Sequence, residues 1–229
     1  MEPYFGLQFH FKEAKILRFK EVGLWRYDEK RYFTNTSQKY LMYDNLDIGN
    51  RSWIAGRERF SLITALILGK ILNRIVILPK FNCYGCVHGC VKRVDNYCAF
   101  NALFHVKTFD SHLSGRYREH AFLQHPKVPD TITGSITPKI LISEKGNQEY
   151  DGLSLGDTIT IKTKDKNQIF QKDIINWFGL GSFSEFAVLS FYSLDFNIHV
   201  EDTSWLNEFE DALKPCNYRQ DPRGFKRLI

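Results

Sequence analysis

The sequence predicts one α/β domain built on a mainly parallel sheet, and two neighbouring features support this. Residues 39–43 (KYLMY) and 75–78 (IVIL) have the composition of short strands, and Pro79 closes the second one. Between them, residues 59–72 (RFSLITALILGKIL) are apolar on nearly every face, as in a helix that is packed between a sheet and other elements. Strand, helix and strand in this order form a right-handed unit with parallel strands. We therefore expect a Rossmann-like fold of three layers.

The rest of the chain repeats this pattern less strongly. Residues 5–11 alternate like a short strand, and residues 12–25 show a helical spacing of apolar side chains. Beyond residue 135 the sequence predicts strands at 138–143, 157–163 and 186–194, and a short helix at 173–178 before a glycine. The alternation of strands and helices continues the α/β pattern to the end of the domain.

Capping residues mark the expected helix ends and the domain limits. Asn73 ends the helix expected at residues 59–72, because Asn tolerates the left-handed backbone conformation. A last helix has Trp205, Leu206, Phe209 and Leu213 on its apolar face, and its expected N-cap is Thr203 or Ser204. We expect a lead-in strand and helix over residues 1–38, the Rossmann-like domain over residues 39–214, and a basic tail or linker over residues 215–229.

Composition excludes some classes of function. The 229 residues are 43% hydrophobic, enough for a sizeable core, and the net charge of +5 is spread along the chain. Such a weak, dispersed charge does not indicate nucleic-acid binding. No apolar run approaches the roughly 20 residues of a membrane span. The first residues lack a signal peptide, so we expect either a cytoplasmic protein or a piece of a longer chain.

The loop between Asp44 and Arg59 is the best-marked candidate site. Backbone N–H groups at the start of a helix that follows a parallel strand attract anions. Here Gly49 and Gly56 allow close backbone approach, and Arg57 and Arg59 add positive charge. We expect the amides near Gly56 to Phe60 to hold a diphosphate, with an arginine as clamp. The loop has neither a G-x-G-x-x-G nor a Walker motif, so a plain connection with solvated arginines is the alternative.

Residues 39–80 resemble the start of the protein O-fucosyltransferase family. The segments Leu72-Asn73-Arg74 and Ile77-Leu78-Pro79 fit its turn and its apolar strand, and Gly56-Arg57 stands where its donor-binding loop begins. The resemblance implies a fold similar to the N-terminal half of a GT-B glycosyltransferase. Together with the loop's own chemistry, this makes Asn45, Gly56, Arg57, Glu58, Arg59 and Phe60 the candidate donor- or phosphate-binding residues. The family commonly has Gly-Asn-Gln in this loop where this chain has Glu58-Arg59-Phe60, so GDP-fucose is not implied as the donor.

A longer stretch, roughly residues 14–129, is similar to plant arabinosyltransferase-like proteins, which are nucleotide-diphospho-sugar transferases. The matching pieces include residues 13–25, 39–45 and 118–126 (REHAFLQHP). That family's Asp-x-Asp metal motif has no counterpart here. The resemblance implies a nucleotide-sugar donor, a protein or glycan acceptor, and a place in the secretory pathway or Golgi lumen, with the cytoplasm as the alternative.

Four cysteines fall within a short stretch, at Cys83, Cys86, Cys90 and Cys98. One interpretation is a zinc site completed by a nearby histidine, although the spacing has only one C-x2-C pair. The second is disulfide bonding, since both resembling families carry cysteines just after the Pro-ended strand. Free buried thiols are the third. Cys216 is left over, and no cofactor is firmly implied.

The segment Arg118-Glu119-His120 combines a cation, an acid and a base. Glu119 or His120 could deprotonate an acceptor hydroxyl, and Arg118 could stabilise a leaving diphosphate. The alternative is a structural ion pair beside the apolar Phe122 and Leu123.

Together these features predict glycosyl transfer from a nucleotide sugar to a protein or glycan hydroxyl, by one lobe or a fragment of a larger enzyme. The first alternative is a non-catalytic interaction module of the same fold. The second is a binding domain stabilised by zinc at Cys83 to Cys98.

Overall fold

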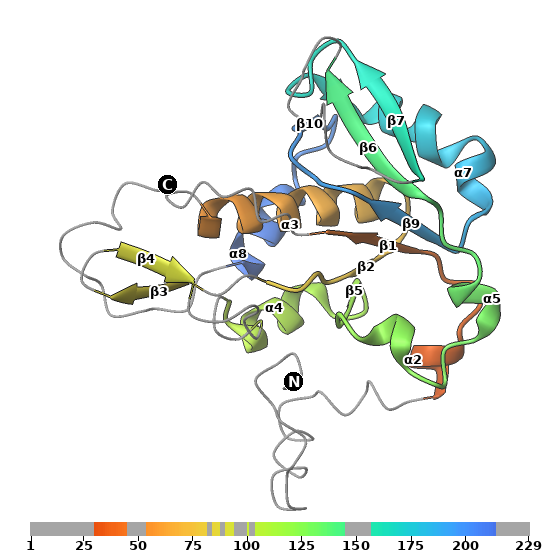
Figure 1. Cartoon of the computed structure of the whole chain (residues 1–229), viewed down its shortest axis with the longest axis horizontal. Helices are drawn as coiled ribbons and strands as arrows, with labels where there is room; N and C mark the ends of the chain where they lie inside the picture. The colour runs from red at the N-terminus through yellow and green to blue at the C-terminus, as the bar shows by residue number, and fades with distance from the viewer. Residues whose placement is uncertain are drawn as a thin grey trace, which may run out of the picture.

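A six-stranded parallel sheet forms the centre of the molecule (Figure 1). It is seen in a computed structural model that describes residues 30–44, 54–81, 84–87, 90–93, 100, 104–144 and 157–213. In spatial order the strands are β5 (Tyr117–Arg118), β2 (Ile75–Ile77), β1 (Tyr40–Tyr43), β9 (Val188–Phe191), β6 (Lys139–Glu144) and β7 (Thr158–Thr163). All neighbouring strands run parallel, which confirms the expected α/β fold with a mainly parallel sheet.

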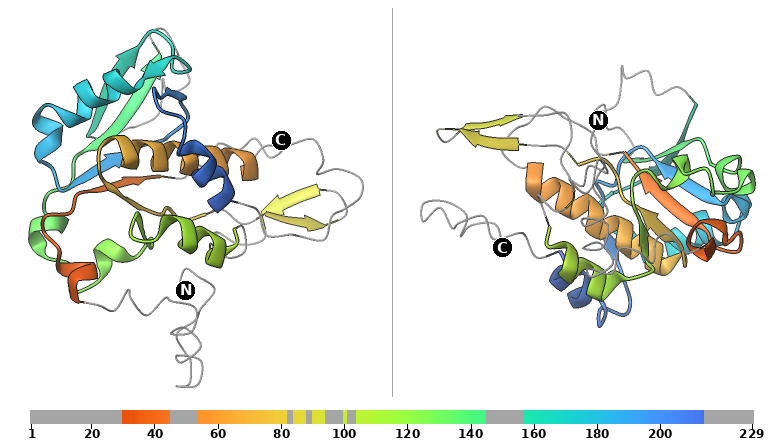
Figure 2. Two further views of the ribbon diagram at one scale, coloured as in Figure 1. Left: turned by 180° about the vertical axis from the view of Figure 1, so that it is seen from behind. Right: turned by 90° about the horizontal axis from the view of Figure 1, so that it is seen from below.

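Helices cover both faces of this sheet. One face carries α3 (Ile54–Ile71), α4 (Val106–Leu113), α6 (Gln171–Ile174), the π-helix η4 (Ile175–Gly179) and α8 (Leu206–Ala212). Figure 2 shows α4 and α8 side by side in this layer. The other face carries α2 (Lys30–Thr34), the 3₁₀ helix η3 (Phe122–Gln124) and α5 (Asp130–Thr133). The short α7 (Ser182–Glu185) precedes β9.

The alternation of side chains along β1 separates two apolar cores. Leu41 and Tyr43 belong to the core under α3, whereas Tyr40 packs against α2 and η3 in the second core. Successive strand residues point to opposite faces, so a sheet covered on both sides needs apolar residues at every position. This explains why residues 40–43 have no polar alternation.

The predicted strand–helix–strand unit is present, with one correction to its helix. Strands β1 and β2 occupy the expected positions, and Asn73 has the predicted left-handed conformation with a φ of 50°. However, α3 begins at Ile54, five residues before the expected start at Arg59. Ala, Arg and Glu are good helix formers, and a single Gly costs a helix only about 1 kcal/mol. Residues 54–58 therefore extend the helix instead of forming a loop. None of the described helices is long and apolar enough to cross a membrane.

Later elements match the prediction in part. Strands β6 and β7 and the helix pair α6 and η4 lie where the sequence placed strands and a helix. The predicted N-cap of α8 is wrong, because Trp205 occupies that position and makes no side-chain capping bond. The backbone N–H of Ser204 donates instead to the Asp202 carboxylate. The predictions for residues 5–11, 12–25 and 215–229 lie outside the described residues.

Several short elements were not predicted. Helix α4 is amphipathic, with Phe109 and Leu113 buried, and His105 caps its start by accepting a bond from the N–H of Thr108. Strand β5 is only two residues long, too short for a periodic signal. Two small sheets accompany the main one: β3 (Tyr84–Val87) pairs antiparallel with β4 (Cys90–Arg93), and β8 (Ile169–Phe170) pairs parallel with β10 (Ile198–His199).

A buried arginine forms hydrogen bonds to backbone carbonyl groups at the amino-terminal edge of the sheet. Arg74 precedes β2, is 5% exposed, and donates to the carbonyl oxygens of Phe186 at 2.9 Å, Phe183 at 3.1 Å and Tyr40 at 3.2 Å. Burial lowers its pKa to about 10, so the guanidinium remains charged at neutral pH. Arg74 therefore joins β1 to the segment that leads into β9.

Candidate functional site

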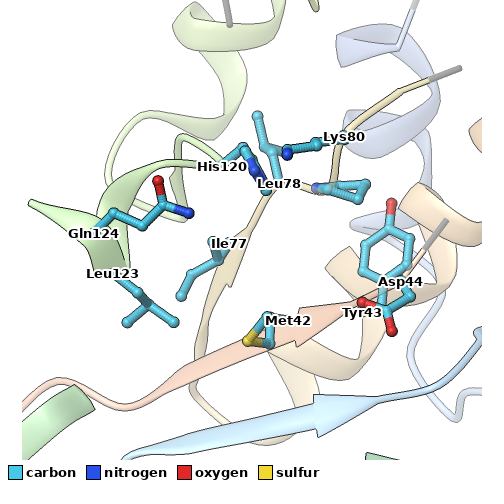
Figure 3. A pocket seen from close by; sticks show the side chains of 10 residues that line it. Met42, Tyr43, Asp44, Ile77, Leu78, Lys80, His120, Leu123 and Gln124 are labelled. Atoms are coloured by element: carbon cyan, nitrogen blue, oxygen red, sulfur yellow. The ribbon is translucent and has the colours of Figure 1, made fainter. Parts of the chain in front are cut away.

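A pocket of about 360 Å³ lies at the carboxyl ends of β1 and β2 (Figure 3). Its lining residues come from three segments: Met42, Tyr43 and Asp44; Ile77, Leu78, Pro79 and Lys80; and His120, Leu123 and Gln124. In open parallel sheets, ligands bind beyond the carboxyl ends of the strands, where the loops diverge. The volume is in the range of small-molecule sites.

Strand register brings these three segments together. Met42 lies opposite Ile77 in the β1–β2 pair, and Ile77 lies opposite Arg118 in the β2–β5 pair. The residues that follow each strand therefore leave the sheet at the same edge. As a result, Lys80 after β2 and His120 after β5 reach the same pocket (Figure 3).

His120 and Lys80 set the electrostatics of this wall. Burial lowers the pKa of His120 to about 4, and the nearby Lys80 ammonium group contributes to the decrease. The imidazole is therefore neutral at pH 7 and has one ring nitrogen that can accept a hydrogen bond or a proton. Lys80 places a positive charge beside this acceptor, an arrangement that suits an anionic ligand.

Asp44 contributes the acidic group of the pocket, and its charge is balanced. The Nζ atom of Lys139 lies 2.7 Å from one carboxylate oxygen of Asp44 and 2.8 Å from the other. Both side chains are partly exposed, so the pair contributes little to stability. Its consequence for the pocket is that the negative charge of Asp44 is largely neutralised.

Tyr43 lines the pocket, and its buried phenol lies near the carboxylate of Glu58 on α3. Burial raises the pKa of Tyr43 well above its usual range, and the Glu58 carboxylate raises it further. The phenol therefore stays protonated at all physiological pH values. Glu58 is only 3% exposed. A carboxylate at this position repels a phosphate group. The charge of Glu58 is therefore the wrong sign for a residue that binds phosphate.

The structure places the predicted donor-loop residues within α3. Because the helix begins at Ile54, the N–H groups of Glu58, Arg59 and Phe60 bond to carbonyl groups one turn earlier. Only the first turn, which includes Gly56, keeps N–H groups that are not used within the helix. The expectation that amides near Gly56 to Phe60 hold a diphosphate therefore applies to the first turn of α3 and stays a prediction. Asn45 and the side chain of Arg57 lie outside the described residues.

Of the three predicted catalytic residues, only His120 lines the pocket. Arg118 is 6% exposed, its Nη1 donates to the carbonyl of Tyr117 at 2.8 Å, and its guanidinium carbon lies 4.1 Å from the ring centre of Tyr32. Glu119 accepts a hydrogen bond from the Tyr32 hydroxyl. Arg118 and Glu119 thus contact α2, and the structure brings neither into the lining of the pocket.

The cysteine predictions fall mostly outside the described residues. Cys83, Cys98 and Cys216 are not described, and Cys86 and Cys90 belong to the β3–β4 hairpin. In that hairpin Cys86 is opposite Val91 and Cys90 is opposite Val87, so the two cysteines do not face each other across the strand pair. Among the described side chains, no group of three or more His, Cys, Asp and Glu residues could hold a metal ion. Disulfide bonding and zinc binding stay predictions.

Sequence reasoning missed most of the pocket lining. Lys80 and Gln124 of the lining were not singled out, nor was Lys139, which pairs with Asp44, because each is a single polar residue beside an apolar run. A usable signal existed for Lys80. It is the first charged residue after a buried parallel strand, and such positions lie at the ligand-binding edge of the sheet. Lys139 could not be found this way, because it stands at the beginning of its strand.

Comparison with known proteins shows similarity at the level of the fold. No family model and no curated protein matches the chain. Two solved structures of POFUT1 match 79% of this chain: one in complex with GDP (16% identity, TM-score 0.44) and one in complex with GDP-fucose (18% identity, TM-score 0.46). The match covers 51% and 52% of those chains, so this chain spans about half their length. A likeness this weak carries no conclusion about ligand or activity.

Proposed function

We propose that the pocket binds a nucleotide sugar and that this chain takes part in glycosyl transfer to a protein or glycan hydroxyl. The observation that carries the proposal is the position of Lys80 beside a neutral His120 at the carboxyl ends of two adjacent parallel strands. Such a site offers both a cation for a diphosphate and an uncharged acceptor for a hydroxyl proton.

The charges around the pocket favour an anionic ligand. Lys80 contributes one positive charge, and the Asp44 carboxylate is paired with Lys139. The remaining lining is largely apolar and includes Met42 on β1 and Ile77 on β2 (Figure 3). An apolar surface next to a cation fits a ligand that has a flat base or sugar joined to phosphate groups. The resemblance of residues 39–80 to the O-fucosyltransferase family favours the same ligand class.

The proposed reaction assigns one role to each polar side chain. The bond between the anomeric carbon and the diphosphate oxygen breaks, and the acceptor oxygen bonds to that carbon. Lys80 stabilises the negative charge on the departing nucleoside diphosphate. His120 receives the proton of the acceptor hydroxyl, and the negative charge of the bound diphosphate raises the pKa of this imidazole toward the working pH.

One observation favours a second candidate, a nucleotide-binding module without transfer. Arg118 and Glu119 are engaged by Tyr32 and by the Tyr117 carbonyl, which leaves His120 as the one predicted catalytic side chain among the described pocket residues. Binding needs Lys80 but not a proton acceptor. The two candidates therefore share a ligand and differ in turnover.

Calorimetric titration with GDP and UDP tests the shared part of both candidates. We expect saturable binding of one of them, with an affinity reduced about tenfold or more in K80M, because a charge-assisted hydrogen bond is lost. K162M, an exposed lysine on β7, is the matched control and should bind like the wild type. Absence of binding to either nucleotide at millimolar concentration rejects the proposal. A second assay measures the release of GDP or UDP from a nucleotide sugar. Release by the wild type that is abolished in H120A indicates transfer, whereas binding without release indicates a binding module.

A further inference from the structure

Helix α2 packs against the segment that forms one wall of the pocket. The ring centre of Tyr32 lies 4.1 Å from the guanidinium carbon of Arg118, and the Tyr32 hydroxyl donates to Oε2 of Glu119. The next residue, Phe33, stacks on the ring of His125 with 3.9 Å between centroids. Two consecutive residues of α2 thus contact both ends of residues 118–125. Figure 1 shows α2 next to this part of the chain.

This wall has little support from the sheet. The N–H of Leu78 donates to the carbonyl of Arg118 at 2.9 Å, and the strand ends there. The next backbone bonds are local turns, from the N–H of Phe122 to the Glu119 carbonyl at 3.0 Å and from Gln124 to Ala121 at 2.9 Å. His120, which points toward Lys80, therefore lies on a turn whose orientation depends on side-chain contacts.

We propose that Tyr32 is a positioning residue for this pocket: by holding the Glu119 carboxylate, its hydroxyl fixes the direction of the adjacent His120 side chain. The inference rests on the proposed function only for the identity of the ligand. The hydrogen bond between Tyr32 and Glu119, and the orientation of His120 that we infer from it, do not require a bound ligand. Helix α2 stands before the Rossmann-like unit in sequence, so the site depends on a segment outside the strand–helix–strand unit that forms its floor.

The hydroxyl of Tyr32 can be separated experimentally from its ring. Y32F keeps the ring against Arg118, and it keeps the edge contacts with Phe33 at 4.8 Å and Phe122 at 5.8 Å. It removes the hydrogen bond to Glu119. A purely structural role predicts a small loss of stability and an unchanged His120, because the packing surface is the same. A positioning role predicts a change at His120.

The imidazole of His120 is the direct readout. NMR titration of the histidine ring protons follows each of the seven histidines, and the signal missing in H120Q identifies His120. In the wild type we expect a pKa of about 4 for His120. In Y32F we expect this pKa to rise to about 5 or higher, because a freed turn exposes the ring to water. We also expect affinity for GDP or UDP to fall about two- to tenfold.

Y117F is a matched control. The Tyr117 hydroxyl also donates to a carboxylate, that of Asp110 at 3.1 Å, and Tyr117 lies next to Arg118 on β5. Because Tyr117 belongs to the core on the opposite face, Y117F should leave the pKa of His120 unchanged. The same pKa in Y32F and the wild type, or the same rise in both variants, overturns the inference.

A second variant covers the case in which Y32F does not fold. E119Q weakens the same hydrogen bond from the acceptor side. Amide hydrogen exchange at residues 119–124 should then be faster than in the wild type, whereas unchanged exchange contradicts a positioning role. If the wild type binds neither nucleotide, the proposed function fails, but the imidazole and exchange measurements still decide the role of Tyr32.

Discussion

The ammonium group of Lys139 lies 2.7 Å from the carboxylate of Asp44, and this ion pair joins the start of β6 to the end of β1 although β9 lies between those strands. The contact is possible because β6 is staggered along the sheet, with Ile140 opposite Phe191, the last residue of β9. Lys139 is therefore level with the carboxyl end of β1. The pair brings a residue from the second half of the chain to the rim of the pocket.

K139M should weaken nucleotide binding without unfolding the protein. The substitution leaves Asp44 unpaired at the rim, where its charge repels a diphosphate. We expect the affinity for GDP or UDP to fall about five- to tenfold at low salt and less at high salt, because both groups are partly exposed. The double variant D44N/K139M should recover most of the affinity. Equal binding by K139M and the wild type at low salt would show that Asp44 does not face the ligand.

R74M should strongly reduce the free energy of unfolding. The substitution removes the hydrogen bonds from the Arg74 guanidinium to the carbonyl oxygens of Tyr40, Phe183 and Phe186, which are buried or half-buried. A loss of about 3 kcal/mol is expected from several broken hydrogen bonds to a charged group. Urea unfolding measures this loss.

The control for Arg74 is R116M. Arg116 pairs with Glu208 at 3.2 Å, but their side chains are 40% and 33% exposed. The free energy of unfolding of R116M should therefore fall by less than about 1 kcal/mol. Similar losses in R74M and R116M would mean that the backbone bonds of Arg74 contribute no more than a surface ion pair.

G69A should destabilise the protein even though alanine favours helices. A Cβ atom at Gly69 would lie 2.8 Å from the carbonyl oxygen of Arg74 and 3.0 Å from Cγ2 of Val76. Relieving this contact requires α3 to move away from β2, at a cost of about 1–3 kcal/mol. That cost exceeds the roughly 1 kcal/mol gained in helix propensity. Thermal unfolding measures this loss. G181A, with no atom within 4 Å of its Cβ, is the control and should leave the stability nearly unchanged.

The sequence predicted the centre of the fold because that part is governed by local rules. The apolar runs at β1, α3 and β2 are buried on every side, and the left-handed Asn73 stops the helix as its side chain allows. The start of α3 was misplaced, since a glycine next to arginines is equally compatible with a loop and with a first helical turn. Local sequence does not decide between them, and the burial of Glu58 near Tyr43 is a contact that is not local in sequence.

The candidate site was predicted less well for the same reason. His120 was singled out from its chemistry, but the grouping with Arg118 and Glu119 assumed that neighbours in sequence share a site. In the structure Tyr32 contacts both of these residues on the side of α2, 87 positions before Glu119. Long-range contacts of this kind leave no periodic pattern in a single sequence.

The burial of His120 should make the protein sensitive to mild acid. Its pKa is about 4 in the folded state and close to 6.5 when unfolded, so the unfolded chain binds the proton more readily between these values. The contribution of the neutral imidazole is complete above pH 6.5 and is lost as the pH falls toward 4. Urea unfolding at pH 7, 6 and 5 should therefore show a smaller decrease in stability for H120Q than for the wild type. H112Q, at an exposed position on α4, should follow the wild type. Parallel pH curves for H120Q and the wild type would mean that the imidazole is accessible to water and protonates in the folded protein as it does in the unfolded chain.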